Sequence, residues 1–211
     1  WMDNRDHKVL FAVVDCTGHG VPGAMVSVMA HNGLNRCVKE FGLTKPSDIL
    51  DRLNLILDET FEKSEAVIKD GMDIALVSLD FGSSGRLQNH DSKMKIHYAG
   101  ANNPLWIIRN CDGISSFEEV KADVQPIGKY SARKPFKNYG LQLNKGDSIY
   151  LFSDGYADQF GGLKGKKFKY KQFEKLLLSI QEREMEEQKG ILSKTIDEWR
   201  GDLDQIDDIC I

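Results

Sequence analysis

The sequence lacks the features that mark several common protein classes. None of its four cysteines, Cys16, Cys37, Cys111 and Cys210, belongs to a CxxC pair, so we expect reduced thiols and no zinc site. The net charge of −4 removes the electrostatic case for nucleic acid as a partner. No signal peptide and no apolar run of membrane-spanning length is found. We therefore expect a cytoplasmic location for this chain, and whether its parent protein is membrane-anchored stays open.

The remaining composition is that of a globular protein. With 211 residues, of which 41% are hydrophobic, the chain can bury a core, and we expect a single domain over residues 1–211. Its strands are predicted mainly as antiparallel hairpins, with helix pairs before and after them, which indicates an α+β fold. Both ends look cut, because Trp1–Asn4 is typical of a strand end with a turn, and Ile211 falls inside a strand that has only begun.

The most informative stretch follows the first predicted strand. An apolar run over Val9–Val14 indicates a buried strand, and Asp15 comes directly after it. Glycines and Pro22 then open a helix. An unpaired carboxylate is costly to bury, and a bound metal ion is a common way to offset that cost.

Two later stretches also place acids at strand ends. Ser148–Phe152 reads as a strand that leads to Asp154, and Asp207 and Asp208 precede what we predict as a C-terminal strand. Magnesium and manganese ions prefer carboxylate, carbonyl and water ligands. Acidic strand ends far apart in sequence therefore predict an oxygen-ligand metal site, assembled by folding.

These stretches and the loops between them resemble one family. The matching segments, in the family's order and spread over nearly the whole chain, are Asp15–Gly23, Tyr98–Leu105, Gln125–Gly128, Phe152–Gly155 and Asp207–Ile209. With these motifs the chain resembles metal-dependent protein serine/threonine phosphatases of the type 2C (PPM) class, in the bacterial sporulation protein E-like branch. The resemblance implies two antiparallel β-sheets packed as a central sandwich, with helices on the outer faces.

The resemblance also implies a metal site and its ligands. Two Mn²⁺ or Mg²⁺ ions are expected, with Asp15 bridging them, the main-chain carbonyl of Cys16 binding one, and Asp154 and Asp207 completing the opposite side. Asp208 is the neighbour most easily confused with Asp207. We expect the Cys16 thiol to pack inward. For His19 we favour ordering of the loop by hydrogen bonding over a role as general acid.

One departure from the family concerns the chain's beginning. The family carries a further metal-binding aspartate in a pattern like Gly-Asp-Phe-Tyr-Trp, and Trp1 matches its last residue. The fold is therefore expected to lack its first strand here, and this fragment to be metal-poor or inactive. An alternative of another class stays open: a non-catalytic pseudophosphatase that binds a signalling partner.

The expected activity is hydrolysis of phosphoserine and phosphothreonine on a bacterial regulatory protein, by a water activated between the two ions. Anti-sigma factor antagonists are the substrates that the resemblance suggests, with a sensor domain upstream in the parent chain; a homodimer stays open. A two-metal nuclease is disfavoured by the acidic charge.

Two loops have open roles. We interpret Asn102–Pro104 as a turn and not as a substrate contact. Gly161–Lys167 is either a basic flap beside the site or a solvated loop.

Overall fold

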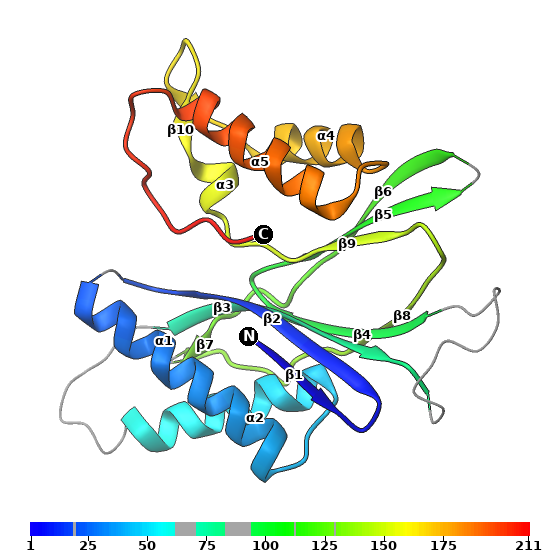
Figure 1. The fold of residues 1–211 in the computed structure, drawn as a ribbon. Coiled ribbons are helices and arrows are strands. Elements are labelled where there is room, and N and C mark those ends of the chain that lie inside the picture. Colours follow the sequence, from blue (N-terminus) through cyan, green and yellow to red (C-terminus); the bar gives the residue numbers. More distant parts are fainter. Residues whose placement is uncertain (19, 62–70, 83–93, 112, 129) are drawn as a thin grey trace. The chain divides into compact units, whose positions relative to one another are not determined.

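A computed structural model describes the chain except residues 19, 62–70, 83–93, 112 and 129. Its contacts divide the chain into two compact units, each built from two segments. Unit 1 comprises Trp1–Leu105 and Val120–Lys145, and unit 2 comprises Trp106–Glu119 and Gly146–Ile211. Both contain antiparallel sheets and helices, which confirms the α+β class (Figure 1).

Unit 1 is built on a six-stranded sheet with the strand order β1-β2-β3-β4-β8, in which β7 also pairs with β3. Every pairing in it is antiparallel. The strands are β1 (Met2–Arg5), β2 (Lys8–Cys16), β3 (Gly71–Asp80), β4 (Met94–Ala101), β7 (Ile127–Gly128) and β8 (Tyr139–Leu143).

Three helical segments cover one face of this sheet (Figure 1). They are α1 (Gly20–Asn35), the π-helical η1 (Arg36–Glu40) and α2 (Pro46–Phe61). The sequence predicts that the second helix starts at Pro46 or Ser47, and α2 begins at Pro46. The first helix, α1, begins two residues before the predicted Pro22. Gly42, with a φ of +69°, stands just after the π-helical turn, in the left-handed region that glycine adopts readily.

The core of unit 1 is mostly aliphatic. Alternate residues of β2 and β3, among them Leu10, Ala12, Ile74 and Leu76, pack against the helices. The intervening residues lie on the other face of the sheet, and Asp15 and Asp73 are among them.

Unit 2 contains a three-stranded sheet with the order β6-β5-β9, a two-stranded hairpin and three helices. The outermost residues of β5 and β6, Leu105 and Val120, are counted with unit 1. The elements are β5 (Leu105–Cys111), β6 (Ile114–Val120), β9 (Ser148–Tyr150), α3 (Gly155–Asp158), β10 (Phe160–Gly161), β11 (Lys166–Lys167), α4 (Tyr170–Ile180) and α5 (Met185–Arg200).

The core of unit 2 is rich in aromatic side chains. Phe173 on α4 stacks on Tyr156, with 4.6 Å between ring centroids, and meets Phe152 and Trp106 at 5.3 and 5.4 Å. These rings lie between the sheet and the helices, so each helix of the unit is fixed through an aromatic contact.

Three predictions of secondary structure need correction. The spacing of Leu192, Ile196 and Trp199 predicts a last helix over Ile191–Trp199, whereas α5 begins at Met185 and its first turns are charged and mostly exposed. Asp207–Ile211 forms no strand; it is an extended segment bonded to Ser153. The N-terminal residues form a strand, β1, and the backbone N–H of Ala12 donates to the carbonyl of Trp1, which continues the pairing with β2.

Within the described residues, no helix is both long and apolar enough to cross a membrane.

Candidate functional site

Asp15 lies at the end of β2, on the sheet face that α1 and α2 leave uncovered. The pairing of β2 with β3 sets Asp15 directly opposite Asp73. Side chains of directly paired residues share one face, with Cβ atoms about 4.5–5.5 Å apart. Two half-buried carboxyl groups are therefore neighbours at this end of the sheet.

Asp73 was not predicted as a site residue. Burial raises the pKa of its carboxyl group, and a hydrogen bond from Asn102 partly offsets this effect. Asn102 follows β4 and donates through Nδ2 to Oδ1 of Asp73 at 2.8 Å. A sequence signal existed, because Asp73 stands between the apolar residues Met72 and Ile74 near the start of a mostly apolar strand.

The Asn102 turn has a strained backbone. Asn102 has a φ of +58°, in the left-handed region that asparagine tolerates better than most residues. Its N–H donates to the carbonyl of Asp123, and the Tyr98 hydroxyl donates to the carbonyl of Asn103 at 2.6 Å. The interpretation of Asn102–Pro104 as a turn is supported, and the turn fixes the amide that holds Asp73.

The loop after Asp15 is tied to the start of β3. The hydroxyl of Thr17 donates to the carbonyl of Gly71 at 3.0 Å and accepts from the N–H of Gly71 at 2.8 Å. Gly23 in α1 allows a close approach, because a Cβ there would lie 2.6 Å from the carbonyl oxygen of Gly18. These contacts hold the backbone on both sides of the Asp15–Asp73 pair.

The Cys16 side chain packs against the aliphatic core, as predicted. Burial raises the pKa of the thiol, with a smaller upward effect from Asp15 and a lowering hydrogen bond with Ser27. A thiol held neutral is a poor nucleophile. The use of the Cys16 carbonyl as a ligand stays a prediction.

Asp154 belongs to unit 2, where it precedes the first turn of α3. It is half-buried and follows β9 by four residues. A Cβ on the next residue, Gly155, would overlap the carbonyl oxygen of Asp208. Glycine at this position therefore lets the C-terminal segment pass close beside Asp154.

Hydrogen bonds fix that C-terminal segment to Ser153. The Ser153 hydroxyl donates to the carbonyl of Asp208 at 2.8 Å and accepts from the N–H of Cys210 at 3.0 Å. The backbone of Ser153 also donates to the carbonyl of Cys210 at 3.0 Å. The fold thus brings the Asp207–Asp208 segment beside Asp154, although 52 residues separate Asp154 from Asp207.

The two acids of this segment are both exposed, and they differ in their bonding. Oδ1 of Asp207 accepts from the backbone N–H of Asp208 at 2.8 Å, and the carbonyl of Asp207 accepts from Gln205. The local turn therefore orients the carboxylate of Asp207. The preference for Asp207 over Asp208 stays a prediction.

The predicted ligands thus fall into two groups. Asp15 and Cys16 lie in unit 1 and Asp154 and Asp207 in unit 2, and the common site that they would form stays a prediction. Across the described residues, no group of three or more His, Cys, Asp and Glu side chains is arranged to hold a metal ion. His19 lies outside the described residues.

The donor set nevertheless has the chemistry that Mg²⁺ and Mn²⁺ require. Asp15 and Asp73 supply neighbouring carboxylates, and Asp154 and Asp207 supply two more from a hydrogen-bonded pair of segments. Hard cations select such oxygen donors. The residues present therefore fit the predicted metal.

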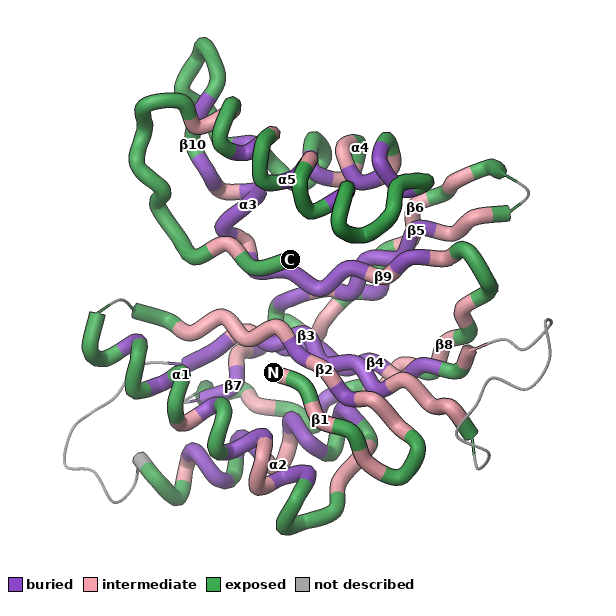
Figure 2. The backbone as a smooth tube through the Cα atoms, in the orientation of Figure 1, coloured by how far each residue is buried: buried purple, intermediate pink, exposed green. Residues whose placement is uncertain are grey.

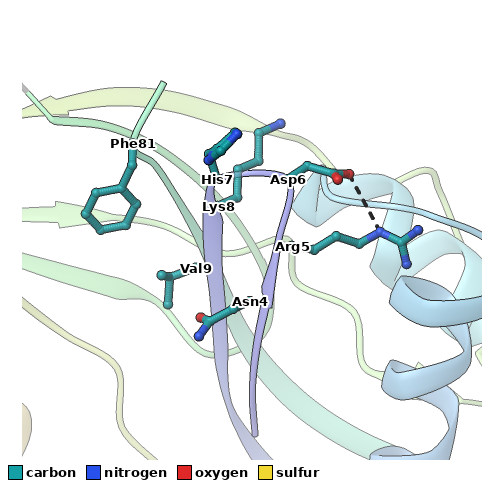
Figure 3. Close-up of a pocket in the computed structure, with 7 residues that line it drawn as sticks. All are labelled: Asn4, Arg5, Asp6, His7, Lys8, Val9 and Phe81. Atoms are coloured by element: carbon teal, nitrogen blue, oxygen red, sulfur yellow. Dashed lines mark ion pairs between the residues drawn. The ribbon is translucent and has the colours of Figure 1, made fainter. Parts of the chain in front are cut away.

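A separate pocket lies at the other end of β2, around the β1–β2 turn (Figure 3). It has a volume of about 380 Å³, and its lining residues are Asn4, Arg5, Asp6, His7, Lys8, Val9 and Phe81. Arg5 pairs with Asp6 at 3.6 Å across its rim. Asp15 is at the opposite end of the strand, so this pocket is not part of the acidic site.

Comparisons with known proteins agree with the motifs. The family model described as Stage II sporulation protein E (SpoIIE) matches residues 5–211. The SiaA-PP2C domain of Pseudomonas aeruginosa is 27% identical, with a TM-score of 0.81, and the match covers 99% of this chain and 76% of that one. No curated protein matches this chain.

Two further solved structures share the fold. The structure of the RsbU and RsbW domains of a Mycobacterium tuberculosis protein is 21% identical with a TM-score of 0.71, and the match covers 99% of this chain and 52% of that one. The PP2C phosphatase domain of SpoIIE from Bacillus subtilis, with a fragment of its regulatory domain, is 18% identical with a TM-score of 0.66, covering 96% and 52%. The chain belongs to the SpoIIE family and has the fold of its PP2C-type phosphatase domains.

Proposed function

We propose that this chain is the phosphatase domain of a signalling protein and hydrolyses phosphoserine and phosphothreonine on a protein substrate with Mn²⁺ or Mg²⁺. The observation that carries the proposal is the pairing of Asp15 with Asp73 across β2 and β3. Both residues lie within the part of the chain that the SpoIIE family model matches. A cation bound beside two half-buried neighbouring carboxylates would offset the cost of burying their charge.

Each residue would contribute a distinct part. Asp15, Asp154 and Asp207 would hold two divalent ions, together with the Cys16 carbonyl, and Thr17 would keep Asp15 in place through Gly71. When bound, such ions lower the pKa of water and neutralise phosphoryl oxygens. Asp73, held by Asn102, would orient Asp15 or a water beside it.

A covalent route through Cys16 or Cys37 is disfavoured by the burial of these thiols. Burial keeps Cys16 neutral and raises the pKa of Cys37 to about 11. Neither is poised to form a thiolate at neutral pH, so direct attack by water is the simpler chemistry.

The pairing of β1 with β2 predicts where the aspartate of the family's Gly-Asp-Phe-Tyr-Trp pattern would lie. Trp1 pairs with Ala12, so each residue further upstream would face the next residue of β2. If Gly-Asp-Phe-Tyr precedes Trp1 in the parent chain, continued pairing sets its aspartate opposite Asp15. Three carboxyl groups would then form a row across β1, β2 and β3.

The experiment uses the parent chain with Mn²⁺, and p-nitrophenyl phosphate and a phosphoserine peptide as substrates. We expect metal-dependent hydrolysis, loss of it in Asp154→Asn, and retention in Asp204→Asn, an exposed neighbour of the C-terminal segment. In Asp73→Asn we expect Mn²⁺ affinity or activity to fall about 10- to 100-fold. Calorimetric titration with Mn²⁺ measures affinity independently of turnover.

The outcomes separate the two candidate functions. A folded parent chain that binds Mn²⁺ and releases no phosphate would contradict the enzyme. If that protein still binds the phosphoserine peptide, a pseudophosphatase is the better description. Unchanged turnover in Asp154→Asn would remove this residue from the site.

A further inference from the structure

The strongest charge asymmetry of the chain begins six residues after α3, the helix that Asp154 precedes. Residues 164–171, here named the basic segment, contain five lysines and no acid. The segment carries +5, and since the net charge is −4, the rest of the chain carries −9. Five positive charges within eight residues give this stretch a locally positive electrostatic potential on an otherwise acidic protein.

The lysines of the basic segment are available for binding. All five are exposed, and Figure 2 colours the loop beyond β10 as exposed. Lys167 pairs with Asp158 at 2.7 Å. Within the part of the chain that the structure describes, no carboxylate lies within ion-pair distance of Lys164, Lys166, Lys169 or Lys171.

An exposed apolar residue accompanies the charges. Leu163, which directly precedes the segment, has a relative exposure of 109%, and Tyr170 within it is 43% exposed. These two side chains give a partner apolar contacts beside the lysines.

The basic segment has a fixed backbone. Gly162 donates to the carbonyl of Trp199 at 2.7 Å, and Phe168 donates to the carbonyl of Gln159 at 3.0 Å. The ring of Phe168 is buried and meets Trp199 edge-on at 5.3 Å. A preorganised surface loses less conformational entropy on binding than a disordered tail would.

The segment is also tied to the helix of the proposed site. Asp158, which Lys167 contacts, is the last residue of α3, and Asp154 precedes the first. The N–H of Lys169 donates to the carbonyl of Ala157 in that helix at 2.7 Å. In the proposed function, Asp154 at the N-terminal end of α3 would bind metal. The lysines of the basic segment lie beside the C-terminal end of the same helix.

We propose that the basic segment is a docking surface for an acidic stretch of the protein substrate, an inference that rests on the proposed phosphatase function. A phosphorylated protein region brings negative charge of its own, and lysines beside the site would raise its association rate. A membrane or a nucleic acid is an extended anion, and it would also face the −9 on the rest of the chain.

The test compares two variants with the same change in charge. In the docking variant Lys164, Lys166 and Lys171 become Gln, which leaves the Lys167–Asp158 pair intact. In the control variant Lys121, Lys145 and Lys189, all exposed and outside the segment, become Gln. Circular dichroism checks that both fold.

Two readouts are measured at low and high salt. Fluorescence anisotropy reports binding of a labelled, unphosphorylated acidic peptide, and kcat/KM is compared between phosphoserine peptides with acidic and with neutral flanks. For the docking variant we expect acidic-peptide affinity and the preference for acidic flanks to fall about 10-fold, with unchanged hydrolysis of p-nitrophenyl phosphate. The control variant should change either readout less than about 2-fold, since scattered exposed charges contribute little.

The outcomes separate this proposal from the proposed function. Peptide binding that depends on the segment but occurs without hydrolysis would keep the docking surface and contradict the phosphatase. Hydrolysis with no difference between the two variants would overturn the docking surface alone. Binding of the wild type to phosphatidylserine vesicles or to a single-stranded oligonucleotide, lost in the docking variant and absent with the acidic peptide, would also overturn it.

Discussion

The two units of this protein bury different kinds of side chain. In unit 1 a broad sheet packs on helices through leucine, isoleucine, valine and alanine, and Phe136 is the one aromatic residue of its described core cluster. In unit 2, six of the eleven residues in the described core cluster are aromatic, on a sheet of three strands. A small sheet offers few core positions, so large rings supply the buried area that a broad sheet obtains from many aliphatic residues.

The largest expected effects come from truncating each core. Phe173→Ala removes three ring contacts from unit 2 and should cost about 3–5 kcal/mol in the free energy of unfolding. Leu53→Ala, at a fully buried position of unit 1, should cost about 2–5 kcal/mol. Urea unfolding followed by circular dichroism measures both. If Leu53→Ala costs clearly more than Phe173→Ala, single residues of the aromatic core do not contribute more stability than those of the aliphatic core.

A second comparison concerns one ion pair in each unit. In unit 2 the fully buried carboxylate of Asp147 contacts Arg109 at 2.9 Å and also accepts from the N–H of Asn110. Asp147→Ala should destabilise the protein by about 1–3 kcal/mol, because the groups that it satisfies lose their partner. In unit 1 the Asp58–Arg133 pair is more exposed, at 38% and 26%, so Asp58→Ala should cost about 1 kcal/mol or less. Equal losses of melting temperature would contradict this difference in burial.

A third comparison makes the same substitution in one helix of each unit. A Cβ on Gly33 in α1 would overlap Cδ1 of Leu53, so Gly33→Ala should destabilise unit 1 by about 1–3 kcal/mol. A Cβ on Gly190 in α5 meets no atom within 4 Å, so Gly190→Ala should stabilise unit 2 by about 0.5–1 kcal/mol. Thermal unfolding of the two variants should therefore shift in opposite directions. A shift of the same sign would show that helix propensity outweighs packing at Gly33.

The smallest effect concerns thiol reactivity. Cys37 in unit 1 is fully buried, and desolvation raises its pKa from 9.0 to about 11, whereas Cys111 and Cys210 in unit 2 are exposed. A colorimetric disulfide reagent at pH 8 should modify Cys111 and Cys210 rapidly and Cys37 only on unfolding. Rapid modification of Cys37 in native protein would contradict its burial.

The same thiol implies a direction of pH dependence. Because the pKa of Cys37 is higher in the folded state, the unfolded chain ionises first as pH rises above about 9. The stabilisation from this group is complete below pH 9 and is lost as pH approaches 11. Cys37→Ala should show a shallower loss of stability over that range in denaturant titrations.

The sequence predicted those helices and strands whose structure depends on residues close to one another in the chain. The apolar spacing of α2 and the buried strand before Asp15 each depend on neighbouring residues, and both elements are present. The strand nevertheless continues two residues further than predicted, because Asp15 and Cys16 pair with Asp73 and Met72 of β3. Asp73 was missed because its meaning depends on pairing with Asp15 across two strands. The C-terminal strand was wrong because bonds to Ser153, distant in sequence, hold that segment in another conformation.

The start of α5 shows another limit. Its first turns are mostly charged and exposed, and the one buried position before Ile191 is the polar Gln188, so no apolar periodicity marks this stretch. Gln188 accepts from the hydroxyl of Tyr150 at 2.7 Å, a contact that no local pattern encodes. The joining of Asp154 to the Asp207 segment likewise follows from tertiary bonds, although the acids themselves were predicted.

Each unit is made of two separate segments, so the chain passes from one unit to the other three times. During translation the hairpin of β5 and β6 leaves the ribosome before β9 and the helices that cover it exist. Trp106 and Phe117 therefore lack their covering helices while residues 120–145 complete the sheet of unit 1. During this interval the nascent chain exposes an aromatic surface that chaperones can bind. The surface is buried only after α4 and α5 have been synthesised.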